Sequence, residues 1–200
     1  GTAAQFARKT DRKASVTVIE KDKYPQYSKC GLPHAISGII PKFNDLIEFS
    51  DDWFKTAKID LLLETTVEKI DTSKKIVIAK KGSNVIKKPY DSLIIATGAK
   101  PSIPPINNIK KGSNLIKGIF VLRTINDAKD ISSSAKKGDN ATIIGAGLIG
   151  LELAESLYKK KMKVTVVEAL PSILANTLDK DMSKIVYDEI LKQVNILTDH

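Results

Sequence analysis

Apolar residues in this chain follow two patterns, the short continuous runs of buried strands and the three-to-four-residue spacing of amphipathic helices. Residues 141–144 form a run that ends in three β-branched side chains, which favours a buried strand. Residues 148–160 continue with helical spacing, and residues 164–167 return to a β-branched run. The apolar face of the helical part consists of Leu148, Leu151, Leu153, Ala154 and Leu157. The pattern therefore predicts a strand–helix–strand unit over residues 141–168.

The first twenty residues repeat the second half of this unit. Residues 2–14 have the pattern of a short amphipathic helix, and SVTVIE at 15–20 matches KVTVVE at 163–168 in four of six positions. Gly1 stands 19 residues before Glu20, and Gly150 stands 18 residues before Glu168. We therefore interpret the start of the chain as a second copy of the unit, in which Gly1 corresponds to Gly150.

Between the two copies the pattern changes every few residues. Ser50 precedes two acids and is predicted to cap a helix over 51–58. Residues 80–83 have the composition of a hairpin turn. Residues 90–98, YDSLIIATG, are expected to form a buried strand that ends in a turn of small residues. Four shorter strands are predicted at 59–63, 66–70, 75–79 and 84–87.

The second half of the chain is expected to begin after a connection. Residues 100–118 carry three prolines and two glycines, which is typical of a linking segment. Thr124 is predicted to cap a helix that runs to about residue 133. Further elements are expected at 119–122 (strand), 179–192 (helix) and 194–197 (strand).

This order of elements predicts the α/β class, with two Rossmann-like dinucleotide-binding domains. We assign residues 1–110 to the first domain and 111–200 to the second. Both are expected to be incomplete in this chain, because the first lacks its opening strand and the second ends within its sheet.

Composition and charge limit the classes of protein to which this chain can belong. A hydrophobic content of 42% with 28% charged residues is that of a soluble globular protein, and no apolar run is long enough to span a bilayer. The net charge is +9, yet the basic residues are scattered, with three in a row only at 159–161. We interpret them as a solvated surface and expect neither membrane nor nucleic-acid binding, although nucleic-acid binding stays as an alternative that salt-dependent retention on DNA would support.

The number of cysteines in the chain indicates the cellular compartment. Cys30 is the only cysteine, so no disulfide can form within the chain, and a reducing cytoplasmic setting is predicted. No metal-binding spacing of Cys and His occurs, and we expect no metal site.

The chemistry of the second unit follows from its glycines. Gly145, Gly147 and Gly150 have the spacing G-x-G-x-x-G, which gives a tight turn, close approach of a pyrophosphate, and close helix–strand packing. The helix N-terminus supplies N–H groups to the phosphates. Glu168 can accept a hydrogen bond from a ribose 2′-hydroxyl, which favours NADH over NADPH. The alternative is a glycine-rich turn that serves packing alone. Two such sites in one chain indicate flavin plus nicotinamide chemistry.

Cys30 is the candidate for the reactive group. Cys30-Gly31-Leu32-Pro33 resembles the start of a helix, where free N–H groups favour the thiolate, and Lys29 adds positive charge. His34 follows four residues later and would share a helical face with Cys30 as an acid–base partner. The alternatives are a small buried cysteine and a structural histidine.

Together these motifs resemble the flavin-dependent pyridine nucleotide–disulfide oxidoreductases over essentially the whole chain. The matching stretches are 1–20, the cysteine segment, YDSLIIATGA at 90–99, LRTINDA at 122–128 and GAGLIGLELAE at 145–155. Members with a redox disulfide have a second cysteine five residues after the first, where this chain has Ala35. The resemblance is therefore to the single-cysteine branch of coenzyme A–disulfide reductases, NADH oxidases and peroxidases, and persulfide reductases.

The resemblance implies roles by position. Gly1 and Glu20 would bind FAD, the main chain at Val67 would lie near the adenine, and Thr97 and Gly98 would pass close to the flavin nucleotide. The glycine motif and Glu168 would bind NAD(P)H. Leu148 would cover the nicotinamide pocket, and Glu152 would lie near the flavin–nicotinamide junction.

The implied activity is transfer of a hydride from NAD(P)H through FAD to a disulfide, a persulfide or polysulfide, or oxygen or peroxide, through Cys30. Coenzyme A as a substrate stays open, because Gln26, Tyr27, His34 and Ala35 depart from the pattern of the coenzyme A enzymes. The family's second FAD segment and dimerisation domain follow the nicotinamide domain, so a homodimer is expected for the full-length protein. The alternative is a nucleotide-binding redox sensor or partner-binding flavoprotein without significant turnover.

Overall fold

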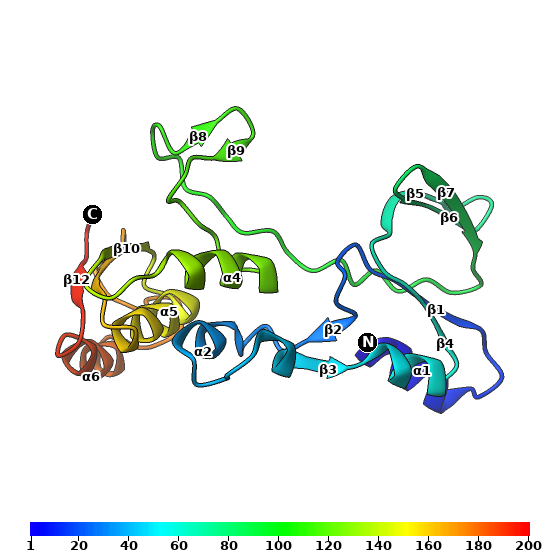
Figure 1. Cartoon of the computed structure of the whole chain (residues 1–200), viewed down its shortest axis with the longest axis horizontal. Helices are drawn as coiled ribbons and strands as arrows, with labels where there is room; N and C mark the ends of the chain where they lie inside the picture. The colour runs from blue at the N-terminus through cyan, green and yellow to red at the C-terminus, as the bar shows by residue number, and fades with distance from the viewer. The chain divides into compact units, whose positions relative to one another are not determined.

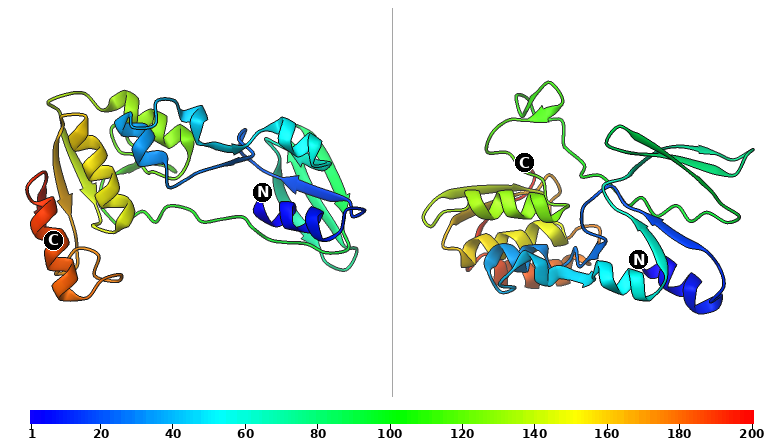
Figure 2. Two further views of the ribbon diagram at one scale, coloured as in Figure 1. Left: turned by 90° about the horizontal axis from the view of Figure 1, so that it is seen from below. Right: turned by 45° about the vertical axis from the view of Figure 1, so that its right-hand side comes forward.

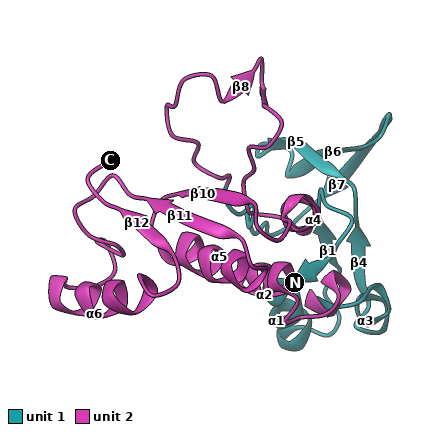
Figure 3. Ribbon diagram, turned by 60° about the vertical axis from the view of Figure 1, so that its left-hand side comes forward, with its two compact units in different colours: residues 1–28, 47–99 teal, residues 29–46, 100–200 magenta.

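The computed structural model describes residues 1–200, which form two compact units (Figure 3). Unit 1 contains residues 1–28 and 47–99, and unit 2 contains residues 29–46 and 100–200. These units are groups of residues in mutual contact, and the domain boundary near residue 110 stays a prediction. None of the helices has both the length and the apolar character needed to cross a membrane.

Unit 1 begins with the predicted helix and strand (Figure 1). The helix α1 (Thr2–Thr10) leads into β1 (Val16–Ile19), which pairs in parallel with β4 (Ile59–Leu62). Between them, β2 (Gln26–Tyr27) pairs antiparallel with β3 (Ile47–Phe49). The helix α3 (Asp51–Thr56) is capped as predicted, because the Ser50 hydroxyl accepts a hydrogen bond from the N–H of Trp53 at 3.3 Å.

The core of this part is aromatic and aliphatic. Phe54, Ile59 and Ala4 are buried together, and the ring of Phe49 stacks on Trp53 with centroids 4.1 Å apart. Burial of Phe54 on α3 and Ile59 on β4 against the small Ala4 of α1 holds these short elements together.

A three-stranded antiparallel sheet completes the regular part of unit 1. Its order is β5 (Thr66–Asp71), β6 (Ile76–Lys81) and β7 (Asn84–Pro89). The predicted hairpin turn is confirmed between β6 and β7, where Gly82 has φ +58°, a left-handed conformation that glycine adopts without strain. A bulge interrupts the pairing of β5 between Val67 and Lys69.

The predicted strand over 90–98 is wrong in this structure. Residues 91–99 are irregular, and the side chains of Ile94 and Ile95 are 64% and 68% exposed. An apolar run becomes a buried parallel strand only when neighbouring strands satisfy its backbone and helices cover its faces. The parallel sheet of unit 1 consists of β1 and β4, and residues 91–99 pair with neither strand.

Unit 2 has a parallel sheet in the order β10–β11–β12, formed by β10 (Asn140–Ile144), β11 (Lys163–Val167) and β12 (Asn195–Leu197). The crossovers are α5 (Leu148–Lys159) and α6 (Lys180–Ile190), which confirms the predicted strand–helix–strand unit. Helix α5, yellow in Figure 2, lies along the orange strand β11. Leu151, Ala154 and Leu157 of α5 are buried, as the helical spacing indicated.

Three smaller helices belong to the same unit. The helix α2 (Leu32–Ser37) packs against α4 (Ile125–Ser134) and α5, and a 3-10 turn, η1 (Phe43–Leu46), follows α2. The predicted cap of α4 is confirmed as a reciprocal capping box, in which Thr124 and Asp127 each bond the other's backbone N–H, at 3.2 and 2.7 Å.

Two details of residues 100–122 differ from expectation. The expected strand at 119–122 is irregular, because no neighbouring strand pairs with it. The linking segment instead contains a small hairpin of β8 (Lys110–Lys111) and β9 (Asn114–Leu115), with Gly112 at φ +64° in its turn.

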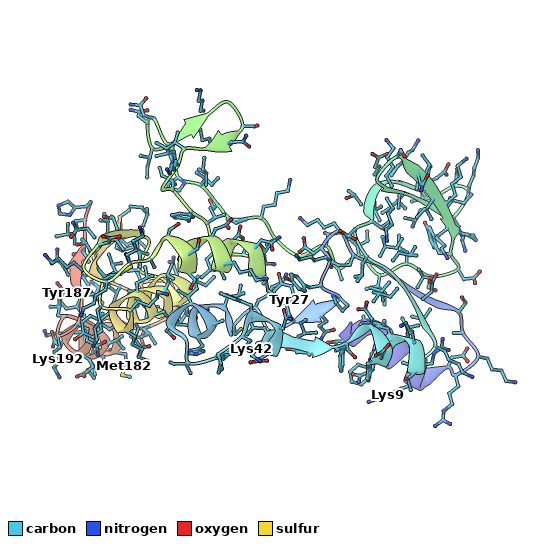
Figure 4. The ribbon with its side chains drawn as sticks, viewed as in Figure 1. Lys9, Tyr27, Lys42, Met182, Tyr187 and Lys192 are labelled. Carbon is cyan, nitrogen blue, oxygen red and sulfur yellow. The ribbon has the colours of Figure 1, made fainter.

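Basic side chains are spread over both units rather than gathered on one element. Lys9, Lys42 and Lys192 are examples, all of them exposed (Figure 4). The ion pairs present are between exposed side chains, such as Lys55–Asp52 at 3.1 Å, and exposed pairs of this kind contribute little to stability.

Candidate functional site

The glycine motif in unit 2 forms the turn between β10 and α5. Gly145 has φ +102°, a conformation that a residue with a Cβ adopts only with strain. A Cβ on Gly150 would collide with the carbonyl oxygen of Gly145, so this position requires glycine for close packing of the helix on the turn. A Cβ on Gly147 would meet nothing within 4 Å, so the turn is open on that side.

The first turn of α5 faces this open side. Helix α5 is 12 residues long and has Gly147 as its N-cap, so no side chain caps its first N–H groups. The side chain of Leu148 in this turn is 58% exposed. A helix N-terminus with uncapped N–H groups favours an anion, and a pyrophosphate has the matching charge and acceptor oxygens.

Glu168 follows β11 directly and lies against the same turn. Its Oε2 accepts a hydrogen bond from the N–H of Ala146 at 2.7 Å, and its Oε1 accepts one from the N–H of Leu170 at 2.9 Å. The register that pairs Ile144 with Val167 brings the carboxylate beside the turn. Each oxygen keeps a lone pair, so the carboxylate can still accept a ribose hydroxyl.

Unit 1 repeats part of this arrangement. Glu20 follows β1, and its Oε1 accepts a hydrogen bond from the N–H of Asp22 at 3.0 Å, two residues on, as Glu168 does from Leu170. Gly1 lies against the side-chain amide of Gln26, which a Cβ at Gly1 would displace.

The other residues expected near a flavin nucleotide also lie in unit 1. Val67 is on β5 beside the bulge and is 40% exposed. Thr97 and Gly98 belong to the irregular segment 91–99, where Gly98 has φ +70°. Their roles toward FAD stay predictions.

Cys30 is an exposed free thiol in the turn that precedes α2. The turn is closed by a hydrogen bond from the N–H of Leu32 to the carbonyl of Lys29 at 3.3 Å. The residues after it anchor the segment, because Leu32, Pro33, Ala35 and Ile36 are buried. The thiol is therefore exposed directly before a segment that is anchored by buried side chains.

The expected helical geometry around Cys30 is partly wrong. Helix α2 begins at Leu32 with Gly31 as its N-cap and is six residues long, so Cys30 lies outside it. The four-residue spacing consequently does not put His34 and Cys30 on one helical face. The difference arises because Gly31 and Pro33 determine the helix start, and the pattern alone could not say which residue is the first helical one.

Glu152 lies on the second turn of α5 and is exposed. It lines a groove of about 350 Å³ between α5 and α6, together with Leu148 and Leu174. The carboxylates of Glu155 and Glu189 on the same rim are paired with Lys159 and Lys192.

Comparison with known proteins gives the family. The family model described as pyridine nucleotide-disulphide oxidoreductase matches residues 1–200. The chain belongs to this family.

Three relatives illustrate the match. An NADH oxidase of Methanocaldococcus jannaschii is 38% identical over 196 residues, which are 96% of this chain and 43% of the relative. A coenzyme A disulfide reductase of Staphylococcus haemolyticus is 29% identical, with 94% and 42% covered. The structure of an NAD-dependent persulfide reductase from A. fulgidus has a TM-score of 0.90 at 34% identity, with 98% and 37% covered. The chain thus spans less than half the length of these relatives.

Membership in the pyridine nucleotide-disulphide oxidoreductases confirms the predicted fold class and cofactors. The neighbouring structures have Rossmann-type domains, and the family uses FAD and NAD(P)H. Of the predicted site residues, the structure gathers Gly145, Gly147, Leu148, Gly150 and Glu168 around one turn.

Two features of this turn are not apparent from the sequence. One is the hydrogen bond from Ala146 to Glu168, and the other is the approach of Leu174, whose N–H donates to the carbonyl of Ala146 at 3.0 Å. The sequence offers no distinct signal for the second, because Ile173 and Leu174 are two of several apolar residues in the loop before α6.

Proposed function

We propose that the protein containing this chain is a FAD-dependent NAD(P)H oxidoreductase that reduces a disulfide, a persulfide or polysulfide, or oxygen or peroxide through Cys30. The observation that carries the proposal is the position of Glu168, whose carboxylate lies against the G-x-G-x-x-G turn at the N-terminus of α5. Three similar proteins are named NADH oxidase, coenzyme A disulfide reductase and persulfide reductase, which supports the range of acceptors.

The nicotinamide dinucleotide binds at the turn in unit 2. The first N–H groups of α5 receive the pyrophosphate, and the open side of Gly147 lets it approach the backbone. Glu168 accepts the 2′-hydroxyl of the adenosine ribose. Leu148 and Glu152 are exposed on the first two turns of α5 and face the nicotinamide end.

FAD binds at the matching part of unit 1. Glu20 accepts the ribose hydroxyl, Gly1 lies beside the phosphates at the N-terminus of α1, and Val67, Thr97 and Gly98 lie along the nucleotide. When bound, the flavin supplies a two-electron carrier between the nicotinamide and the thiol.

Cys30 performs the sulfur chemistry. Its thiolate attacks one sulfur of a disulfide, so that a mixed disulfide forms on Sγ and one thiolate leaves. Two electrons from NADH then cleave the mixed disulfide, which restores the Cys30 thiolate and, with the proton carried by NADH, releases a second thiol. Since the segment around Cys30 has no second cysteine and Ala35 stands five residues on, the oxidised form is a mixed disulfide, a persulfide or a sulfenic acid rather than a disulfide within this segment.

We expect Glu168→Ala to remove the preference for NADH. In the unmodified protein a 2′-phosphate meets the like charge of Glu168 and loses a charge-assisted hydrogen bond, which is worth roughly 1.5–3 kcal/mol, or about one to two decades in affinity. The measurement is kcat/KM with NADH and with NADPH in full-length protein. Equal values for the two coenzymes before the substitution, or an unchanged ratio after it, contradict the assignment.

The acceptor is tested by steady-state NADH consumption of the full-length protein with oxygen, peroxide, coenzyme A disulfide, other small disulfides and polysulfide. Turnover with a sulfur or oxygen acceptor supports the enzyme. Bound nucleotides without turnover on any of them support the alternative, a redox sensor or partner-binding flavoprotein. Sedimentation of the same preparation tests the proposed homodimer.

A further inference from the structure

The main chain of Ala146, between the first two glycines of the motif, is held from both sides. Ala146 is 0% exposed. Its N–H donates to Oε2 of Glu168 at 2.7 Å, and its carbonyl accepts from the N–H of Leu174 at 3.0 Å. Both partners come from the chain after β11, so the orientation of the glycine turn depends on residues outside the motif.

Leu174 reaches Ala146 through an uncommon backbone conformation. It has φ +51°, in the left-handed region that bulky side chains rarely adopt. Its side chain is 7% exposed, and its carbonyl accepts from the N–H groups of Thr177 and Leu178 at 2.7 and 2.9 Å. A strained conformation of this kind persists only where the surroundings over-determine it.

A buried hydroxyl on α6 helps to hold Leu174 in this conformation. Ser183 is 2% exposed, and its Oγ donates to the carbonyl of Ile173 at 2.7 Å. Ile173 is itself 0% exposed. The chain of contacts therefore runs from α6 through Ser183 to the Ile173–Leu174 peptide, and from the N–H of Leu174 to the carbonyl of Ala146.

We propose that Ser183 and Leu174 are positioning residues for the dinucleotide, which hold the glycine turn in the orientation that binds a pyrophosphate. The inference rests on the proposed nicotinamide dinucleotide site. Backbone N–H groups bind phosphate only when they point at it, so a turn already held in place binds without being ordered first. A turn released from Leu174 has to be ordered on binding, and affinity falls while the reaction at the nicotinamide is unchanged.

The test is the dissociation constant of NAD⁺, measured by calorimetry on the FAD-loaded full-length protein. NAD⁺ is used because it binds without reducing the flavin. Loss of one buried hydrogen bond corresponds to roughly a threefold to tenfold change, so Ser183→Ala should weaken NAD⁺ binding by about that factor. FAD content and kcat at saturating NADH should stay at the wild-type values.

Two controls separate positioning from a general loss of structure. Ser183→Thr keeps the hydroxyl and should retain most of the affinity. Ser156→Ala removes a hydroxyl that is 3% exposed and donates at 2.8 Å to the carbonyl of Glu152 in its own helix, so it should leave the dissociation constant unchanged.

Three results overturn the inference. One is equal NAD⁺ affinity in wild type and Ser183→Ala. Another is equal weakening in Ser183→Ala and Ser156→Ala. If Ser183→Ala does not fold, Ser183→Cys, whose thiol is a weaker donor of similar size, replaces it in the measurement. The third result is loss of folding in both variants, which would mean that Ser183 serves stability alone. Failure of the wild-type protein to bind NAD⁺ instead rejects the coenzyme site itself, which is a different outcome.

Discussion

Replacing Cys30 with serine is expected to abolish reduction of disulfides and persulfides by the full-length protein while leaving NADH able to reduce its bound FAD. The serine hydroxyl is not ionised near neutral pH and is a poor nucleophile toward sulfur, so the mixed disulfide cannot form. The thiol is exposed and the buried side chains of this segment follow it, so the substitution removes no packing and should leave the fold unchanged. The measurements are steady-state turnover with sulfur acceptors and anaerobic reduction of the flavin by NADH.

Ser37→Ala is the matched control on the same segment. Its hydroxyl donates to the carbonyl of His34 at 3.0 Å at the other end of α2, so turnover should be unchanged. If Cys30→Ser reduced every sulfur and peroxide acceptor at the wild-type rate, Cys30 would take no part in the reaction. The protein would then be an NADH–acceptor reductase that uses the flavin alone.

Gly150→Val is expected to weaken NAD⁺ binding by about tenfold to a hundredfold and to lower the stability of the protein. A Cβ at this position collides with the carbonyl oxygen of Gly145 and lies 3.2 Å from its carbonyl carbon, so α5 must move away from the turn. Overpacking of this kind costs roughly 1–3 kcal/mol. The measurements are calorimetric binding of NAD⁺ and thermal unfolding.

Gly147→Ala separates the two effects. A Cβ there meets nothing within 4 Å of the protein, so unfolding should be nearly unchanged. The same Cβ faces the proposed pyrophosphate, so binding should weaken. Wild-type affinity in both variants would show that the turn serves packing only.

The elements that could be predicted from sequence are those whose formation depends on residues nearby in the chain. The strand–helix–strand unit over 141–168 follows from apolar spacing and glycine positions, and Ser50 and Thr124 are capping residues whose partners lie within three residues. The strands expected at 90–98 and 119–122 were wrong, because strand formation there requires a neighbouring strand that an apolar run does not itself specify.

The same distinction holds for the site. The order Gly145, Gly147, Gly150 and Glu168 predicts a dinucleotide site at the turn between β10 and α5, since each role follows from spacing. The contact of Ala146 with Leu174 joins residues 28 positions apart through backbone atoms, whose partners residue identity does not reveal. Ser183 likewise resembled any polar residue of an amphipathic helix until its buried contact with Ile173 was seen.

We propose that the full-length protein transfers a hydride from NAD(P)H to FAD. The most direct test is anaerobic addition of NADH to the purified full-length protein while the visible absorbance of the flavin is recorded. We predict that the protein carries FAD and that NADH bleaches this absorbance, with formation of NAD⁺ equivalent to the FAD reduced. A well-folded protein that takes up no FAD, or whose FAD stays oxidised in the presence of excess NADH and NADPH, would contradict this proposal.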